Sequence, residues 1–330
     1  MNTVELAERA SLGALLLEPS QVGVVCAWLR ESDFLHPRSR IAYRLLATAA
    51  SRGGGAGPAA LLDLALGDPQ ARLNTVAGPY LHELMASPGG LGRSAVYARL
   101  VLQASVLRTL TDYAHDLART ARLTEQAPDS VPALVDAIRA THAHAQALQR
   151  RLEEADPAYL TQPAGIVGPP EPRPWTLPDQ TGLEAELVDA IADNPDVIDR
   201  IRGWLTADDF ATGPHASTYA SMLALARAGM PIDHVTTQWN RRDQLACSEA
   251  VPAHLVATRT RCTSHETVRL ARQLLARSVG TRTRAAADAI AALDHDPVPS
   301  SRQRLRTAIH RLDRLLLDTA RWFEPGHPAS

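Results

Sequence analysis

The sequence contains no lysine, so all 34 of its basic residues are arginine. A nucleotide-binding loop of the form G-x-x-x-x-G-K-[ST] uses its lysine to reach the β- and γ-phosphates. These 330 residues therefore contain no such loop. The glycine-rich run at 53–57 is not followed by Lys and Ser/Thr, so we expect it to be a flexible connection.

Aromatic residues, cysteines and long apolar runs are also scarce. Phe, Tyr and Trp make up 4% of the chain, whereas the helix-favouring residues Ala, Leu and Arg dominate it. Cys26, Cys247 and Cys262 form no disulfide framework, which favours a reducing compartment. No apolar run approaches the roughly 20 residues that span a bilayer, and the N-terminus lacks the features of a signal peptide. We expect an all-α, soluble, cytoplasmic protein without membrane contact.

The sequence contains a long internal repeat. The segment 28–34, WLRESDF, returns 176 residues later at 204–210 as WLTADDF. Beyond the glycine-rich run the offset becomes 173, and Ala98-Arg99 aligns with Ala271-Arg272. This period is too long for a solenoid unit, so each copy should be a domain, with Trp28 and Trp204 in its core. Other pairs at the first offset are Glu8 and Glu184, Pro19 and Pro195, Phe34 and Phe210, and Tyr43 and Tyr219.

Each copy ends in a predicted helical hairpin, at about 94–154 and 264–323. In the second helix of each hairpin, apolar residues are spaced 4, 3, 4, 3, 4, which is the pattern of a coiled-coil seam. Two such helices joined by a short turn form a hairpin. The candidates for a hairpin interface are Leu134, Ile138, Leu148, Leu152, Leu305, Ile309, Leu312, Leu316 and Phe323.

The predicted organisation is therefore two copies of a small helical bundle, each followed by a long hairpin. Copy 1 covers 1–154 and copy 2 covers 182–324. Residues 155–181 hold seven prolines and are predicted to form a stiff, extended linker that keeps the copies apart.

Few residue patterns suggest chemistry. His142 and His144 are two positions apart, so on a helix they point in different directions. Two metal ligands on one helix need a separation of three or four positions. Cys262 and His265 have a ligand-like spacing but no second pair nearby. The acids at 33 and 208–209 lie at helix ends, where a carboxylate more often caps a helix than transfers protons. We expect no catalytic residue, metal or cofactor, and hence no enzyme.

The second hairpin carries about twice as many arginines as acids, although the net charge of the whole chain is only −2. Such a face either binds DNA phosphates or an acidic partner, or is a solvated surface with helix-stabilising ion pairs. The arginines of this candidate face are Arg269, Arg272, Arg277, Arg282, Arg302, Arg306 and Arg311.

Copy 1 matches the pattern of a known family. Residues 7–17 read AERASLGALLL, 33–34 are Asp-Phe, and 36–43 read HPRSRIAY. With these motifs the chain resembles the N-terminal domain of DnaB-type replicative helicases, over nearly its whole length apart from the linker and the last residues. Copy 2 keeps Asp209-Phe210 and Tyr219 but lacks the glycine of the first motif.

The resemblance implies a role in assembly. In that family the domain packs through its hairpins into dimers and then into a collar that docks primase. Helicase activity is not implied, because the chain lacks the motor's lysine. We expect a non-catalytic assembly module of the primosome, which pairs with itself within one chain or as a homo-oligomer and docks helicase or primase. The alternative is a DNA-binding protein that uses the arginine-rich second hairpin.

Overall fold

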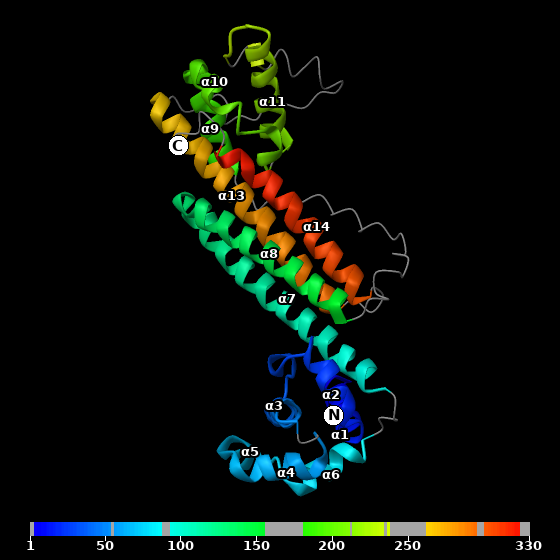
Figure 1. Ribbon diagram of the computed structural model, residues 1–330. Helices are drawn as coiled ribbons and strands as arrows, with labels where there is room; N and C mark the ends of the chain where they lie inside the picture. The colour runs from blue at the N-terminus through cyan, green and yellow to red at the C-terminus, as the bar shows by residue number, and fades with distance from the viewer. Residues whose placement is uncertain are drawn as a thin grey trace. The chain divides into compact units, whose positions relative to one another are not determined.

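The computed structural model describes residues 3–53, 56–87, 93–155, 181–211, 213–233, 236–237, 262–295 and 300–323. The regular elements in these ranges are all helices, and the ranges contain no strand (Figure 1). The prediction of an all-α fold is thus confirmed. The proposed proline-rich linker lies almost entirely outside the described residues.

Copy 1 begins with a series of short helices. Proline occupies the first turn of α2, α3, α4, α5 and α6, where its missing N–H costs no hydrogen bond. The second helix ends at Cys26. The elements before the hairpin are α1 (Thr3–Leu17), α2 (Pro19–Cys26), η1 (Glu31–Asp33), α3 (Pro37–Ser51), α4 (Pro58–Gly67), α5 (Pro69–Leu73) and α6 (Gly78–Met85).

Hairpin 1 consists of α7 (Ser94–Gln126), the turn η2 (Pro128–Ser130) and α8 (Val131–Ala155). Gly13 of α1 explains one motif of copy 1, because a Cβ at this position would collide with the carbonyl oxygen of Leu84 at the end of α6. The glycine therefore allows α1 and α6 to pack closely. Copy 2 has Asp189 at the corresponding position.

In its described residues, copy 2 repeats the order of the elements up to α3 and again in the hairpin. Its first helices are α9 (Thr181–Asp193), η4 (Pro195–Val197), α10 (Ile198–Ile201), η5 (Ala207–Asp209) and α11 (Gly213–Arg227). Hairpin 2 follows as α13 (Ser264–Ala291), η7 (Ala292–His295), α14 (Ser301–Ala320) and η8 (Arg321–Phe323). Helix α13 begins with a capping box, in which Thr263 Oγ1 accepts from the Glu266 backbone N–H at 3.3 Å and the Glu266 carboxylate accepts from the Thr263 N–H at 2.7 Å.

The chain divides into two compact units, and each unit takes segments from both copies. Unit 1 comprises the described residues of Met1–Asp112, His144–Ile166 and Asp294–Arg306. Unit 2 comprises those of Tyr113–Ala143, Val167–Leu293 and Thr307–Ser330. The tip of hairpin 1 thus belongs to the same compact unit as the helices of copy 2.

The aromatic core is built in the same way in both copies. Phe34 packs on Tyr43 with ring centroids 4.8 Å apart, and Phe210 packs on Tyr219 at 5.0 Å. Each phenol donates a hydrogen bond to a backbone carbonyl 14 residues earlier: Tyr43 to Leu29 at 2.8 Å and Tyr219 to Leu205 at 3.3 Å. Burial raises the pKa of both phenols, so they remain protonated donors.

The two tryptophans of the repeat differ in environment. Trp204 is 1% exposed and its indole donates to the Arg200 carbonyl oxygen at 2.9 Å. Trp28 is only half-buried, because α2 has already ended at Cys26 and the chain turns there. The expectation that both tryptophans lie in the core is therefore wrong for Trp28.

We predict that Tyr43→Phe and Tyr219→Phe each lower the free energy of unfolding by about 1 kcal/mol, because each removes a buried hydrogen bond to a backbone carbonyl. Tyr43→Phe also removes the weaker bond to Cys26 Sγ at 3.4 Å. The loss should be smaller for Tyr219, whose bond is longer. Urea unfolding followed by circular dichroism measures both. Tyr97→Phe is the matched control, since this hydroxyl makes no hydrogen bond within the described residues. A loss as large in the control would contradict the assignment.

Candidate functional site

A buried carboxylate joins the first bundle to hairpin 1. Asp33 is 2% exposed, although it lies at the end of the short helix η1. It accepts a hydrogen bond from Ser105 of α7 at 2.9 Å and two from the Arg151 guanidinium of α8, at 3.1 and 2.8 Å. Arg108 of α7 donates to the Asp33 backbone oxygen at 3.1 Å. Both helices of the hairpin are thus fixed to the bundle.

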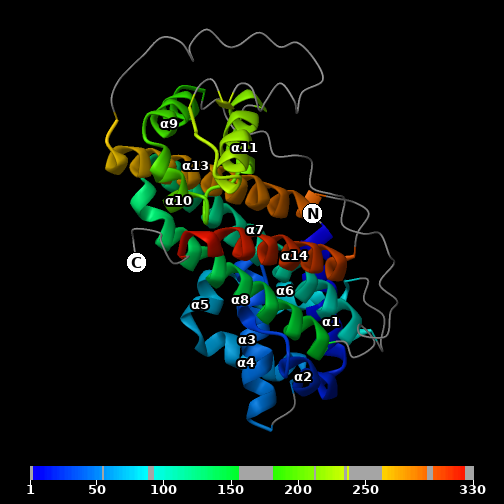
Figure 2. The same ribbon diagram turned by 90° about the horizontal axis from the view of Figure 1, so that it is seen from above.

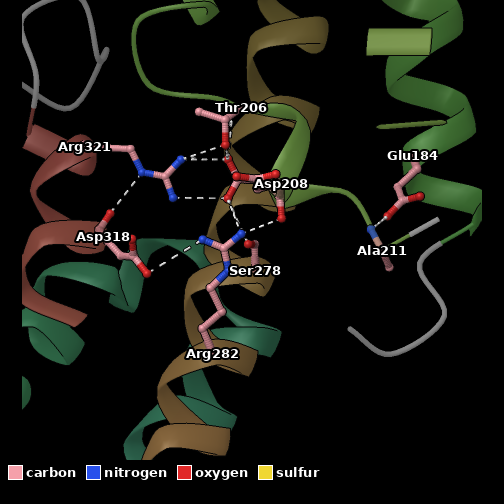
Figure 3. A network of polar contacts seen from close by, with 9 residues as sticks. Glu184, Thr206, Asp208, Ala211, Ser278, Arg282, Asp318 and Arg321 are labelled. Carbon is pink, nitrogen blue, oxygen red and sulfur yellow. Dashed lines mark hydrogen bonds and ion pairs between the residues drawn. The ribbon is translucent and has the colours of Figure 1, made fainter. Parts of the chain in front are cut away.

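Copy 2 repeats this arrangement around Asp209, which is fully buried. Figure 3 shows Ser278, Arg282 and Arg321 gathered beside Asp208. Ser278 of α13 donates to this carboxylate at 2.9 Å, and Arg321 of η8 donates to both of its oxygens at 3.0 and 3.3 Å. Arg282 donates to the neighbouring Asp208 carbonyl oxygen and forms ion pairs with Asp209 and Asp318. Asp33 and Asp209 therefore serve as buried anchors for the two hairpins.

Matching roles fix the correspondence between the hairpins. Ser105 and Ser278 bind equivalent aspartates and are 173 residues apart, which sets the offset between α7 and α13. Arg151 and Arg321 are 170 residues apart, which sets the offset between α8 and α14.

Within unit 2, the end of α7 packs closely on the middle of α13. The Arg284 Nε donates to the Glu125 carboxylate at 2.9 Å, and the Thr281 hydroxyl lies 3.4 Å from the same oxygen. Gly280 faces the α7 backbone: a Cβ at this position would lie 3.0 Å from the Ala121 carbonyl oxygen. The two helices therefore approach each other at a point where a side chain at position 280 would be crowded by α7.

The second helices of the two hairpins also meet in unit 2, where α8 and α14 lie side by side (Figures 1 and 2). His142 Nε2 is 2.8 Å from the Asp313 carboxylate, and the Arg139 guanidinium lies 6.0 Å from the centre of the Phe323 ring. Since the lower number on α8 pairs with the higher number on α14, the helices run antiparallel. They cross at corresponding positions, because the offset of 170 makes Asp313 the counterpart of residue 143.

Six of the nine predicted seam residues are buried, and the other three lie beside the buried stripe of hairpin 2. Leu134, Ile138, Leu148, Leu152, Leu305 and Leu312 are buried, whereas Ile309 and Leu316 are half-buried and Phe323 is 50% exposed. The buried stripe of hairpin 2 runs through Ala308, Leu315 and Trp322, one position before each of these three. Because both members of each adjacent pair are apolar, the spacing alone did not decide which of them faces inward.

The predicted arginine face is corrected at two positions. Arg282 and Arg302 are each only 9% exposed, so neither belongs to a solvated surface. Arg282 is buried because its guanidinium neutralises the buried acid at 209. Arg269, Arg277 and Arg306 are exposed, and Arg272 and Arg311 are half-buried. Burial lowers the pKa of Arg311, but an arginine stays protonated under such conditions.

Other candidate residues have ordinary environments. His142 is not a free surface histidine, because it lies in the hairpin contact, while His144 is exposed. The Cys262 backbone oxygen accepts from the Asn194 side chain at 2.6 Å. Among the described residues no group of histidines, cysteines and acids is arranged to hold a metal ion. No helix in the same ranges is long and apolar enough to cross a membrane.

Sequence reasoning missed the residues that bring the hairpins closest together, Glu125, Gly280 and Arg284. One signal was present. A glycine in the interior of a helix costs roughly 1 kcal/mol relative to alanine, so Gly280 in the middle of α13 needed a packing reason.

A comparison with protein families agrees with the repeat. The family model of the DnaB-like helicase N terminal domain matches residues 2–103 and 176–269, which together cover more than half of the chain. No curated protein and no solved structure matches the chain significantly.

We predict that Arg151→Ala lowers the free energy of unfolding by about 3 kcal/mol, because it leaves the buried Asp33 carboxylate without its arginine partner. Arg321→Ala should cost less, about 2 kcal/mol, since Arg282 remains near Asp209. Arg119→Ala, which removes an exposed ion pair, is the control and should change stability by under about 1 kcal/mol. Urea titrations test the order, and equal losses at 151 and 321 would show that Arg282 does not compensate.

Proposed function

Because this chain belongs to the DnaB-like helicase N-terminal domain family, we propose that it is a non-catalytic assembly module related to the replicative helicase. In this proposal its hairpins pair with each other, and the module docks a replicative helicase or its primase. The matched segments belong to the N-terminal domain alone, and the chain has no lysine for the phosphate loop of a motor. Neither feature supports ATP-driven strand separation by these residues.

The contact between α8 and α14 carries the proposal. Two equivalent helices that cross antiparallel at corresponding positions have the geometry of an isologous dimer interface. Here both helices belong to one chain, so a single molecule supplies two paired domain units. Three such chains would provide the six units of a collar, and one chain would add two units to the collar of a helicase.

The described surface favours a protein partner over DNA. Two of the seven arginines proposed for a nucleic-acid face are buried, and Arg284 is engaged by Glu125. The charge that remains is distributed over two half-buried and three exposed residues. A net charge of −2 gives no long-range attraction to a polyanion.

We predict that the purified chain binds a replicative helicase or primase from the same cell, with hairpin pairing retained. Light scattering gives the mass of the free chain, and biolayer interferometry with immobilised helicase or primase gives the affinity. A single chain or a trimer of chains fits the proposal. A monomer with no affinity for either protein would remove the assembly role.

A salt titration tests the alternative. We predict that any binding to random duplex or single-stranded DNA, followed by fluorescence anisotropy, does not weaken steeply as the salt concentration rises. The reason is that few exposed arginines are available to neutralise phosphates. The variant Arg269→Ala/Arg277→Ala should behave like the parent chain. A steep logarithmic slope that becomes shallower in this variant would establish the DNA-binding alternative instead.

A further inference from the structure

The contact between α7 and α13 is asymmetric at its closest point. A Cβ at Gly280 would lie 2.8 Å from the Glu125 Cγ, 3.0 Å from the Ala121 carbonyl oxygen and 3.3 Å from the Glu125 backbone nitrogen. The last two are backbone atoms of α7, so they move only if the helix moves. The residue at the corresponding position of hairpin 1 is Leu107, by the offset of 173 that Ser105 and Ser278 define. A leucine does not fit where even a methyl group is crowded.

The hairpins also differ in length at this contact. Helix α7 has 33 residues and α13 has 28, so residues 119–126 have no α-helical counterpart in the described part of copy 2. The position that corresponds to Ala121 is Asp294, in the 3₁₀ turn η7. If hairpin 2 paired with the hairpin 2 of another chain, Gly280 would therefore face the charged turn η7 instead of the regular helix α7.

The polar contacts require one hairpin of each kind as well. The position in hairpin 1 that corresponds to Arg284 is Thr111, which has no charge to offer Glu125. On the other side, residue 143, the counterpart of Asp313, is an alanine, so a second hairpin 1 would not provide a carboxylate for His142. Self-pairing of either hairpin loses both ion pairs.

We propose that the two hairpins are specific for each other, with hairpin 1 (Ser94–Ala155) pairing with hairpin 2 (Ser264–Phe323) of the same chain and not with a second copy of itself. Gly280 is the residue that determines this choice, and the ion pairs Glu125–Arg284 and His142–Asp313 reinforce it. This inference rests on the proposed pairing of the hairpins and adds which hairpin each of them pairs with. The paired hairpins are then not available to a helicase subunit, which must dock on the helical bundles.

Cysteine cross-linking of the full chain tests the rule. In a background with Cys26, Cys247 and Cys262 replaced by serine, His142→Cys/Asp313→Cys is treated with a short bis-maleimide. We expect one cross-linked product with the mass of a single chain. The single variants are the matched controls: His142→Cys alone links two chains only if hairpin 1 pairs with itself, and Asp313→Cys alone only if hairpin 2 does. Neither should give linked chains.

Two outcomes would overturn the proposal. Linked pairs of chains from either single variant would show self-pairing, and absence of the single-chain product from the double variant would show that the hairpins do not meet. Both readouts are independent of the partner assay. Loss of helicase or primase binding with intact cross-linking would reject the proposed function alone, and the reverse result would reject the pairing rule alone.

Substitutions at the close contact test the role of Gly280. In the double-cysteine chain, Gly280→Leu introduces the residue found at 107, and we expect a severalfold loss of the single-chain product. The same change at Gly23, which faces open space on α2, should leave the yield unchanged. Glu125→Arg and Arg284→Glu should each lower the yield, and their combination should restore it. A full yield with Gly280→Leu would show that another residue determines the pairing.

Discussion

In each copy a buried aspartate, Asp33 or Asp209, is neutralised by an arginine of the adjoining hairpin. Asp33 and Asp209 are almost fully removed from water, and desolvation of a charge costs several kcal/mol unless hydrogen bonds replace the water. Most of the replacements come from the adjoining hairpin: a serine from its first helix, and Arg151 of α8 or Arg321 of η8 from its second half. Each bundle thereby holds its hairpin in a defined orientation.

Duplication within one chain relaxes a constraint that a homodimer must obey. In an isologous interface each residue serves on both sides, so a change that improves one contact also alters its mirror image. With two genetic copies in a single chain, the sides evolve separately. Gly280 opposes Ala121 at one contact, while its counterpart Leu107 remains large. Asp33 and Asp209 keep matching roles in the two copies, whereas the residues at the contact between α7 and α13 differ from their counterparts.

The sequence predicted the helical class and the matching Phe–Tyr pairs of the two cores, because aromatic residues at one fixed offset report a shared fold, but it did not show that Trp28 is only half-buried. It did not determine which residue of an adjacent apolar pair faces inward, so Phe323 was preferred to the buried Trp322. Nor did composition separate Arg282, which neutralises a buried acid, from the exposed Arg277. These distinctions depend on partners brought together by tertiary packing, and a local pattern carries no information about such partners.

Covalent connection also changes the thermodynamics of pairing. Separate hairpins pair at a rate and extent set by protein concentration, whereas tethered ones experience an effective concentration that is commonly millimolar for a linker able to span the sites. The ion pairs His142–Asp313 and Glu125–Arg284 are partly exposed and contribute about 1 kcal/mol or less each. Tethering therefore drives association, while the polar contacts and Gly280 determine the choice of partner.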